Sequence, residues 1–249
     1  MVGNNRTGIV LQARDLLLLE ALELMRVINR EQAKVVAGFR STTRANARLL
    51  ALTRAGFLRR AYIGARQAVY WRANTELQRA RKKGELSQEP AALFLRHRLE
   101  INRIHLLAKY AAIPNVGWWF GRWQSFQKPL SATLPLIPDG YFEIDSAQGV
   151  RPAFVEVDLG TEAIPVFAKK ASLYLQLATS GEFQQLFSRS QFRVLVVTTA
   201  EGRMHRLRQA VAKLTDKIFW FAPLDVICPE KFWIASWLRP SGDQPQSLS

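Results

Sequence analysis

Residues 134–140 read LPLIPDG, residues 152–158 read PAFVEVD, and residues 164–174 read IPVFAKKASLY. The first segment is an apolar run broken by Pro135 and Pro138, from which an expected strand at 141–144 continues; the second alternates as a strand does, and the third has helical periodicity with a proline in its first turn. Glu156 and Asp158 lie two residues apart on one expected strand, so their side chains project from the same face. Asp139 ends the preceding apolar run, and Lys170 follows on the helix. The sequence therefore predicts three carboxylates on strands, followed by an amine on the next helix.

Converging carboxylates beside an amine are what a metal-dependent phosphodiesterase requires. The carboxylates bind a hard divalent cation, Mg²⁺ or Mn²⁺, which activates water and stabilises the charge of the phosphorane. We expect Asp139 and Glu156 as metal ligands, with Asp158 as a third. Lys170 is favoured over its neighbour as the source of the amine because it lies at i, i+4 from Tyr174 on one helix face. Tyr174 suits either packing or a nucleophilic role, and its spacing favours packing.

The charge of the chain is unevenly distributed. Its 249 residues carry a net charge of +15, and residues 1–84 hold 17 Lys and Arg against 5 Asp and Glu. The remaining residues hold 18 against 15, which is close to neutral. The first third is thus the expected electrostatic footprint on a polyanion. A solvated basic face is the alternative interpretation.

Within this basic third, the pattern predicts a helix, a short helix, a capped helix that begins after Ser41, and two short strands that form a hairpin. This order resembles a winged helix-turn-helix domain. The resemblance implies that the capped helix enters the major groove of DNA while the wing contacts phosphates; a winged helix that binds protein is the alternative. The residues expected near bases are Thr43, Arg44, Asn46 and Arg48, and those expected near the backbone are Arg59, Arg60 and Arg66.

Residues 84–90 are rich in turn-forming residues, and we expect the boundary between two domains there. A long helix over 91–113 follows, with His97 and Glu100 on one face. Glu100 is a candidate catalytic acid, whereas a hydrogen-bonded structural role is favoured for His97. Later segments predict strands at 117–126, 138–144, 152–159, 192–199 and 218–221, helices at 164–179 and 202–214, and an edge strand at 232–238. The polar tail, residues 240–249, has a composition that favours disorder.

The order of these elements resembles the restriction-endonuclease-like, or PD-(D/E)xK, fold. Asp139 matches the acidic position after proline, and Glu156 matches the second acidic position. Asp158 stands where that superfamily has lysine, so the resemblance implies that Lys170 supplies the amine from a migrated position. The fold class expected is therefore α+β or α/β: a winged helix-turn-helix over 1–84, a nuclease-like αβββαβ domain over 85–239, and a disordered tail over 240–249.

The whole chain resembles the replication-relaxation family, which includes the MobC-type relaxases of mobilisable plasmids. The resemblance rests on the basic winged helix together with His97-x₄-Asn102, Pro138-Asp139-Gly140, Glu156-Val-Asp158-x-Gly160-Thr161-Glu162 and Lys170-x₃-Tyr174. It implies a metal-dependent endonuclease that nicks one DNA strand at a plasmid transfer origin, with other relaxosome or coupling proteins as partners. Two rivals are a non-catalytic DNA-binding accessory or regulator, and a double-strand nuclease of a defence or transposition system.

Cys228 is the single cysteine, so the chain cannot form an internal disulfide, and a reducing cytoplasm is the expected compartment. The N-terminus lacks the apolar stretch of a secretory signal, and no segment is apolar for long enough to cross a bilayer. No membrane partner is expected.

Overall fold

The computed structural model describes residues 8–64, 67–73, 89–234 and 237–248, which form two compact units, Met1–Leu106 and Leu107–Ser249. The division between the units falls inside helix α5 (Glu89–Tyr110) rather than at 84–90. The physical reason is burial: Leu95 and Leu99 of α5 pack with apolar side chains of the first unit. Most of the expected boundary segment lies outside the described residues.

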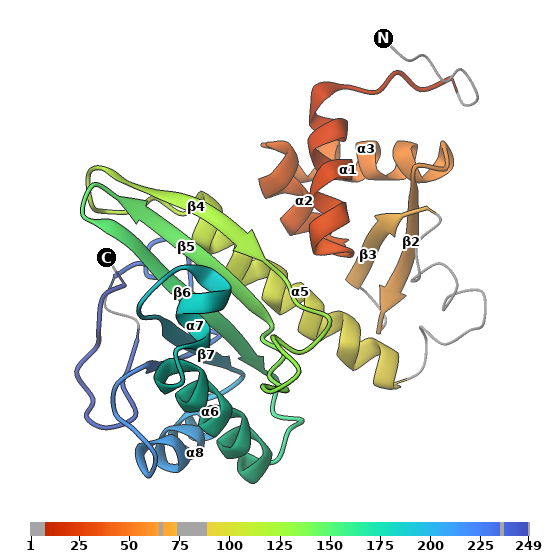
Figure 1. The fold of residues 1–249 in the computed structure, drawn as a ribbon. Helices are drawn as coiled ribbons and strands as arrows, with labels where there is room; N and C mark the ends of the chain where they lie inside the picture. The colour runs from red at the N-terminus through yellow and green to blue at the C-terminus, as the bar shows by residue number, and fades with distance from the viewer. Residues whose placement is uncertain (1–7, 65–66, 74–88, 235–236, 249) are drawn as a thin grey trace. The chain divides into compact units, whose positions relative to one another are not determined.

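The first unit is a small mixed domain of helices followed by a hairpin (Figure 1). Its three strands are antiparallel in the order β1-β3-β2, so β3 lies between the other two. The expected helices and hairpin strands are present within a few residues, and the short strand β1 is an addition. The elements are α1 (Ala13–Met25), β1 (Ile28–Asn29), α2 (Arg30–Ala37), α3 (Thr42–Arg54), β2 (Leu58–Ile63) and β3 (Gln67–Arg72).

Local signals explain where these helices begin and end. The side chain of Asn29 accepts a hydrogen bond from the backbone N–H of Gln32 at 2.9 Å, which caps α2. Gly38 ends α2 in the left-handed conformation, with φ of 63°. Ser41 caps α3 by accepting from the N–H of Arg44 at 3.4 Å. Gly38 and Ser41 thus mark the turn between α2 and α3.

The second unit is built on a mixed five-stranded sheet in the order β4-β5-β6-β7-β8. Strands β4, β5 and β6 run antiparallel, and β6, β7 and β8 run parallel. The molecule is therefore α+β with a mixed sheet, and the short helix α7 is an addition to the expected elements. The elements after α5 are β4 (Trp118–Gln124), β5 (Gly140–Ser146), β6 (Gly149–Asp158), α6 (Ile164–Thr179), α7 (Glu182–Phe187), β7 (Arg193–Thr198), α8 (Glu201–Ala212) and β8 (Phe219–Pro223).

The two faces of this sheet bury different side chains. Helices α6, α7 and α8 cover one face, where Phe154, Tyr174 and Phe219 form part of a large aromatic core. On the other face the ring of Phe142 contacts those of Phe232 and Trp233. Because the parallel strands β6 and β7 are covered on both faces, their sequences are nearly continuous apolar runs.

The end of the chain differs from its expected form. The described residues of the expected edge strand at 232–238 form isolated bridges only, between Leu238 and Phe221 and between Trp237 and Gln246, and residues 235–236 lie outside the described part of the chain. Residues 240–248, for which disorder was expected, instead pack on the second unit. Leu248 is buried, and Arg208 of α8 donates a hydrogen bond to Asp243 at 3.0 Å. None of the described helices is long and apolar enough to cross a membrane.

Candidate active site

The pairing of β5 with β6 brings two of the expected acids together. Gly140 lies opposite Val155 in the antiparallel register, so Asp139 stands next to Glu156 where β6 approaches its end. Asp139 accepts a hydrogen bond from the N–H of Val157 at 2.8 Å, which fixes its carboxylate at this position. Gly140 has no room for a side chain because the ring of Trp123 lies against its Cα. The close packing on Gly140 thus holds Asp139 at the start of β5.

Helix α6 carries an amine and a phenol to the same acid. Lys170 donates a hydrogen bond to one carboxylate oxygen of Glu156, and the hydroxyl of Tyr174 donates to the other. Their spacing of one helical turn puts both side chains on the face of α6 that covers the sheet. Tyr174 is 1% exposed and its ring packs against Phe154, whereas Lys169 points to solvent. The structure therefore brings Lys170, and not Lys169, to the carboxylates.

Burial dominates the electrostatics of Glu156. Removal from water raises the pKa of this carboxyl to about 7; Lys170 lowers the pKa, and the negative charge of Asp139 raises it. The carboxylates of Glu156 and Asp139 in turn raise the pKa of Lys170 against the effect of burial, so the ammonium keeps its charge. A carboxyl that titrates near neutrality beside a fixed ammonium is a common feature of functional sites.

Asp158 makes a different set of contacts at the end of β6. Arg203, in the first turn of α8, donates to Asp158 at 2.7 Å and also to the backbone carbonyl of Glu162. The N–H of Gly160 donates to the other oxygen of Asp158 at 2.5 Å. Burial raises the pKa of the Glu162 carboxyl, to which the charges of Asp158 and Asp139 also contribute. Arg203 and Glu162 therefore also belong to the site. The motifs of the sequence had assigned a role to neither residue.

The donor set fits a divalent cation in part. Asp139 and Glu156 are neighbouring carboxylates, and Mg²⁺ is commonly held by one or two carboxylates together with water. The expected set of three is not assembled: in the described ranges, no three histidine, cysteine or acidic side chains are grouped to hold a metal ion. Asp158 is directed to Arg203 instead. The pair Asp139 and Glu156 is therefore the candidate metal site.

A scan of family models gives one match, to the replication-relaxation family, over residues 19–189. This match covers more than half of the chain and includes Asp139, Glu156, Asp158 and Lys170. The chain belongs to the replication-relaxation family. No curated protein and no solved structure shows significant similarity to it.

The first unit of this replication-relaxation protein presents only some of the expected DNA-binding side chains. Thr43, Arg44 and Asn46 are exposed on α3. Arg48 is directed inward, where it donates to the buried carboxylate of Asp15 at 2.9 Å and to the carbonyl of Val10 at 2.7 Å. Its role there is to join α3 to α1. The sequence does not indicate which distant acidic residue will pair with a charged side chain on a helix.

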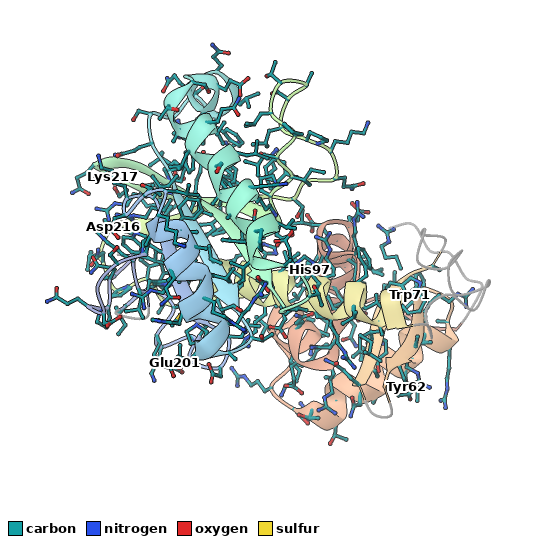
Figure 2. The ribbon with its side chains drawn as sticks, turned by 90° about the horizontal axis from the view of Figure 1, so that it is seen from below. Tyr62, Trp71, His97, Glu201, Asp216 and Lys217 are labelled. Atoms are coloured by element: carbon teal, nitrogen blue, oxygen red, sulfur yellow. The ribbon has the colours of Figure 1, made fainter. Side chains whose placement is uncertain are left out.

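On the hairpin of the replication-relaxation protein, Arg59 and Arg60 are half-buried on β2. The guanidinium of Arg60 lies over the ring of Tyr62, 5.4 Å from its centre, and Tyr62 is 54% exposed (Figure 2). Arg66 lies outside the described residues. The exposed phenol and the stacked arginine make this hairpin a basic, partly aromatic surface.

Helix α5 explains another part of the family motif. The side-chain amide of Asn102 donates to the carbonyl of Val27 at 2.6 Å and to that of Met25 at 3.1 Å. Asn102 is buried and satisfies carbonyls at the end of α1, so its role is structural. Glu100 lies on the same helix in the first unit, with its carboxylate 3.5 Å from Arg103. His97 projects from α5 nearby (Figure 2).

Proposed function

We propose that this protein is a metal-dependent DNA endonuclease that nicks one strand at a plasmid transfer origin during mobilisation. The observation that carries the proposal is the meeting of Lys170 with the paired acids Asp139 and Glu156 at the junction of β5, β6 and α6. Membership of the replication-relaxation family is consistent with this activity. An amine from the helix would replace the lysine whose usual strand position is held by Asp158.

The first unit supports recognition of double-stranded DNA. Three helices followed by an antiparallel hairpin, with a short strand completing the sheet, are consistent with a winged helix-turn-helix domain. On this basis α3 is the helix that would enter the major groove. Thr43, Arg44 and Asn46 would face the bases, and Arg59 and Arg60 the phosphates. The large positive charge of the first third would favour binding through the DNA backbone.

In the second unit, each group of the site has a separate task. Asp139 and Glu156 would hold Mg²⁺ or Mn²⁺, which when bound supplies an acidic centre that activates water and offsets charge on the phosphate. Lys170 keeps a positive charge beside them and would stabilise the additional negative charge of the phosphorane. Tyr174 orients Glu156 by its hydrogen bond, and its burial makes it unsuitable as a nucleophile. The cleaved strand would therefore carry free ends rather than a tyrosine adduct.

A second candidate function is DNA binding without catalysis. The observation that favours it is that both oxygens of Glu156 are occupied, by Lys170 and by Tyr174, while Asp158 is occupied by Arg203. A closed network of this kind could serve to hold β6, α6 and α8 together. On that alternative the protein would be an accessory or regulatory factor on a nuclease-like scaffold.

A supercoiled-plasmid assay separates the two candidates. The substrate should carry the native neighbourhood of the gene, and the protein should be compared with its Asp139→Asn and Glu156→Gln variants in Mg²⁺ and in Mn²⁺. Glu201→Gln is the matched control, because Glu201 is an exposed carboxylate at the start of α8 (Figure 2). We expect open circles from the wild type and from the control, and a loss of at least a hundredfold in both site variants.

The products also test the strand preference. Linear plasmid formed at the same rate as open circles would indicate a double-strand nuclease in place of a nicking enzyme. Retention of DNA binding without any cleavage in either metal would leave the accessory function. Cleavage that persists in Asp139→Asn and Glu156→Gln would rule out the assignment of the site.

A further inference from the structure

We propose that Arg151, Arg193 and Arg239 form a second anion site on the second unit, which binds the phosphate groups of a nucleic-acid strand. This inference rests on the proposed function in taking nucleic acid as the ligand. It is separate from the carboxylate site in position, in chemistry and in the experiment that tests it.

The sheet register places two of the three arginines on one face. Ala153 of β6 lies opposite Arg193 of β7 in the parallel pair, and Arg151 is two residues before Ala153. Paired residues share a face, as do residues at i and i+2 in a strand, so Arg151 and Arg193 project from the same side. By the same rule Glu156 projects from the opposite side.

The third arginine comes from the segment that follows β8. Leu238 and Phe221 exchange both backbone hydrogen bonds at 2.8 Å, which sets the next residue, Arg239, beside Trp220. The carbonyl of Arg239 also accepts from Arg208 at 2.8 Å. The backbone of Arg239 is thus held firmly, although its side chain is exposed.

Tryptophan rings hold two of the guanidinium groups in place. The guanidinium of Arg151 lies 3.9 Å from the centre of the Trp118 ring, and that of Arg193 lies 4.3 Å from the centre of the Trp220 ring. A guanidinium stacked on an aromatic face keeps its N–H groups free at the edge, where they can bind phosphate oxygens in pairs. Trp220 itself is buried, so its ring is a fixed platform.

Among the described residues, several other arginines of the second unit form ion pairs that neutralise their charge, and these three arginines do not. In the described part of the second unit, Arg122 and Arg189 pair with Glu143, Arg203 pairs with Asp158, and Arg208 pairs with Asp243. Arg193 has no such ion pair among the described residues, and its charged neighbours there are Arg151 and Arg239. Burial, together with these two positive charges, lowers the pKa of Arg193 from its ordinary value.

Three neighbouring guanidinium groups, of which that of Arg193 is partly buried, are a favourable site for an anion, because an anion relieves both their repulsion and the desolvation of Arg193. The partly exposed ring of Trp118 beside them favours nucleic acid, in which phosphates alternate with flat bases. Glu156 lies five residues beyond Arg151 on β6, roughly 17 Å at about 3.3 Å per residue. The ligand would therefore be a segment of strand distant from the one at the carboxylates.

The test is a fluorescence-anisotropy titration of a labelled single-stranded oligonucleotide with the full chain, in EDTA and at several salt concentrations. The variant Arg151→Gln/Arg193→Gln is compared with Lys128→Gln/Lys213→Gln, which removes the same charge from exposed positions, one in the segment after β4 and one at the end of α8. We expect an affinity loss on the order of tenfold in the arginine variant, with a salt slope lower by about 1 to 2. The lysine variant should lose less than about twofold.

Equal losses of affinity in the two double variants, or no loss of affinity in either, would overturn the proposal. Either result would mean that the arginines contribute no more to binding than other exposed charges do. A second experiment uses inorganic phosphate as the ligand. If phosphate raises the melting temperature of the wild type, and the arginine variant still binds DNA with wild-type affinity, then the site holds a free anion and the proposal fails. Arg193→Lys and the exposed Arg239→Gln serve if Arg193→Gln does not fold. Because EDTA removes the metal, the result is independent of whether the protein nicks DNA.

Discussion

Glu156 links the structure to a measurable pH dependence. Its pKa in the folded protein is about 7, above the ordinary value of 4.5, and burial is the main cause. The folded state therefore binds a proton more tightly than the unfolded state does between these two values. Stability must then fall as pH rises from about 4.5 to about 7, because the proton is given up in a buried setting.

We expect the Glu156→Gln variant to lack this decline. Its glutamine cannot ionise, so the free energy of unfolding of the wild type should fall relative to the variant by about 3 kcal/mol at most across that window. Urea unfolding of both proteins at pH 4.5, 5.5, 6.5 and 7.5, without metal, measures the difference. Parallel pH profiles would mean that Glu156 is ionised throughout as a partner of Lys170.

Helix α3 combines a structural arginine with an exposed one. Burial raises the pKa of Asp15, but hydrogen bonds from Arg48 and from the backbone of Gln12 outweigh that effect, so the pKa is below its usual value. Arg48 is therefore needed to compensate a buried charge. Arg44, four residues earlier, is exposed on the same helix.

Substitutions at these two positions should affect different properties: the stability of the first unit for Arg48, and DNA binding for Arg44. Arg48→Ala is expected to lower the free energy of unfolding of the first unit by about 3–5 kcal/mol, because the carboxylate of Asp15 is left unpaired. Arg44→Gln should change stability by less than about 0.5 kcal/mol, yet weaken DNA binding by on the order of tenfold. Urea unfolding and anisotropy with duplex DNA measure the two quantities. An Arg44→Gln protein that binds duplex DNA as the wild type does would remove α3 from the interface.

At the scale of the molecule, the C-terminal segment belongs to the second unit although its composition is polar. The side chain of Trp237 is buried, and its backbone carbonyl accepts a hydrogen bond from the N–H of Gln246 at 2.6 Å. The N–H of Leu248 donates to the carbonyl of Trp233 at 3.1 Å. These contacts cover aromatic side chains that would otherwise be exposed.

Removal of residues 240–249 should therefore destabilise the second unit. The loss of buried Leu248 and of the partners of Arg208 is expected to cost roughly 3–5 kcal/mol. Calorimetry should show a lower melting temperature for the second unit and an unchanged transition for the first. Gln244→Ala is the control, since Gln244 is exposed within the same segment. A truncated protein that melts as the wild type does would mean that the segment contributes no stability.

The sequence by itself determined most of the elements and part of the site. Apolar periodicity gave both ends of α6 correctly, and capping residues indicated where α2 and α3 begin. These signals can be read from the sequence because they act between neighbours in the chain. The i, i+4 spacing of Lys170 and Tyr174 likewise assigned them one helix face. The carboxylates on consecutive β-type segments pointed to Asp139 and Glu156 as partners, and the resemblance to a known fold pointed to the same pair.

Only the tertiary structure decided the contacts between distant segments. The β5–β6 register placed Asp139 beside Glu156. The chain that runs from β6 through α6, α7 and β7 to α8 placed Arg203 beside Asp158. This ion pair removed Asp158 from the expected set of metal ligands. The same holds for Arg48, whose partner is 33 residues away. The arginines of the proposed second anion site come from β6, from β7 and from the segment that follows β8. Charge and polarity are local properties of a sequence, but the partner that each charge meets depends on how the strands pair.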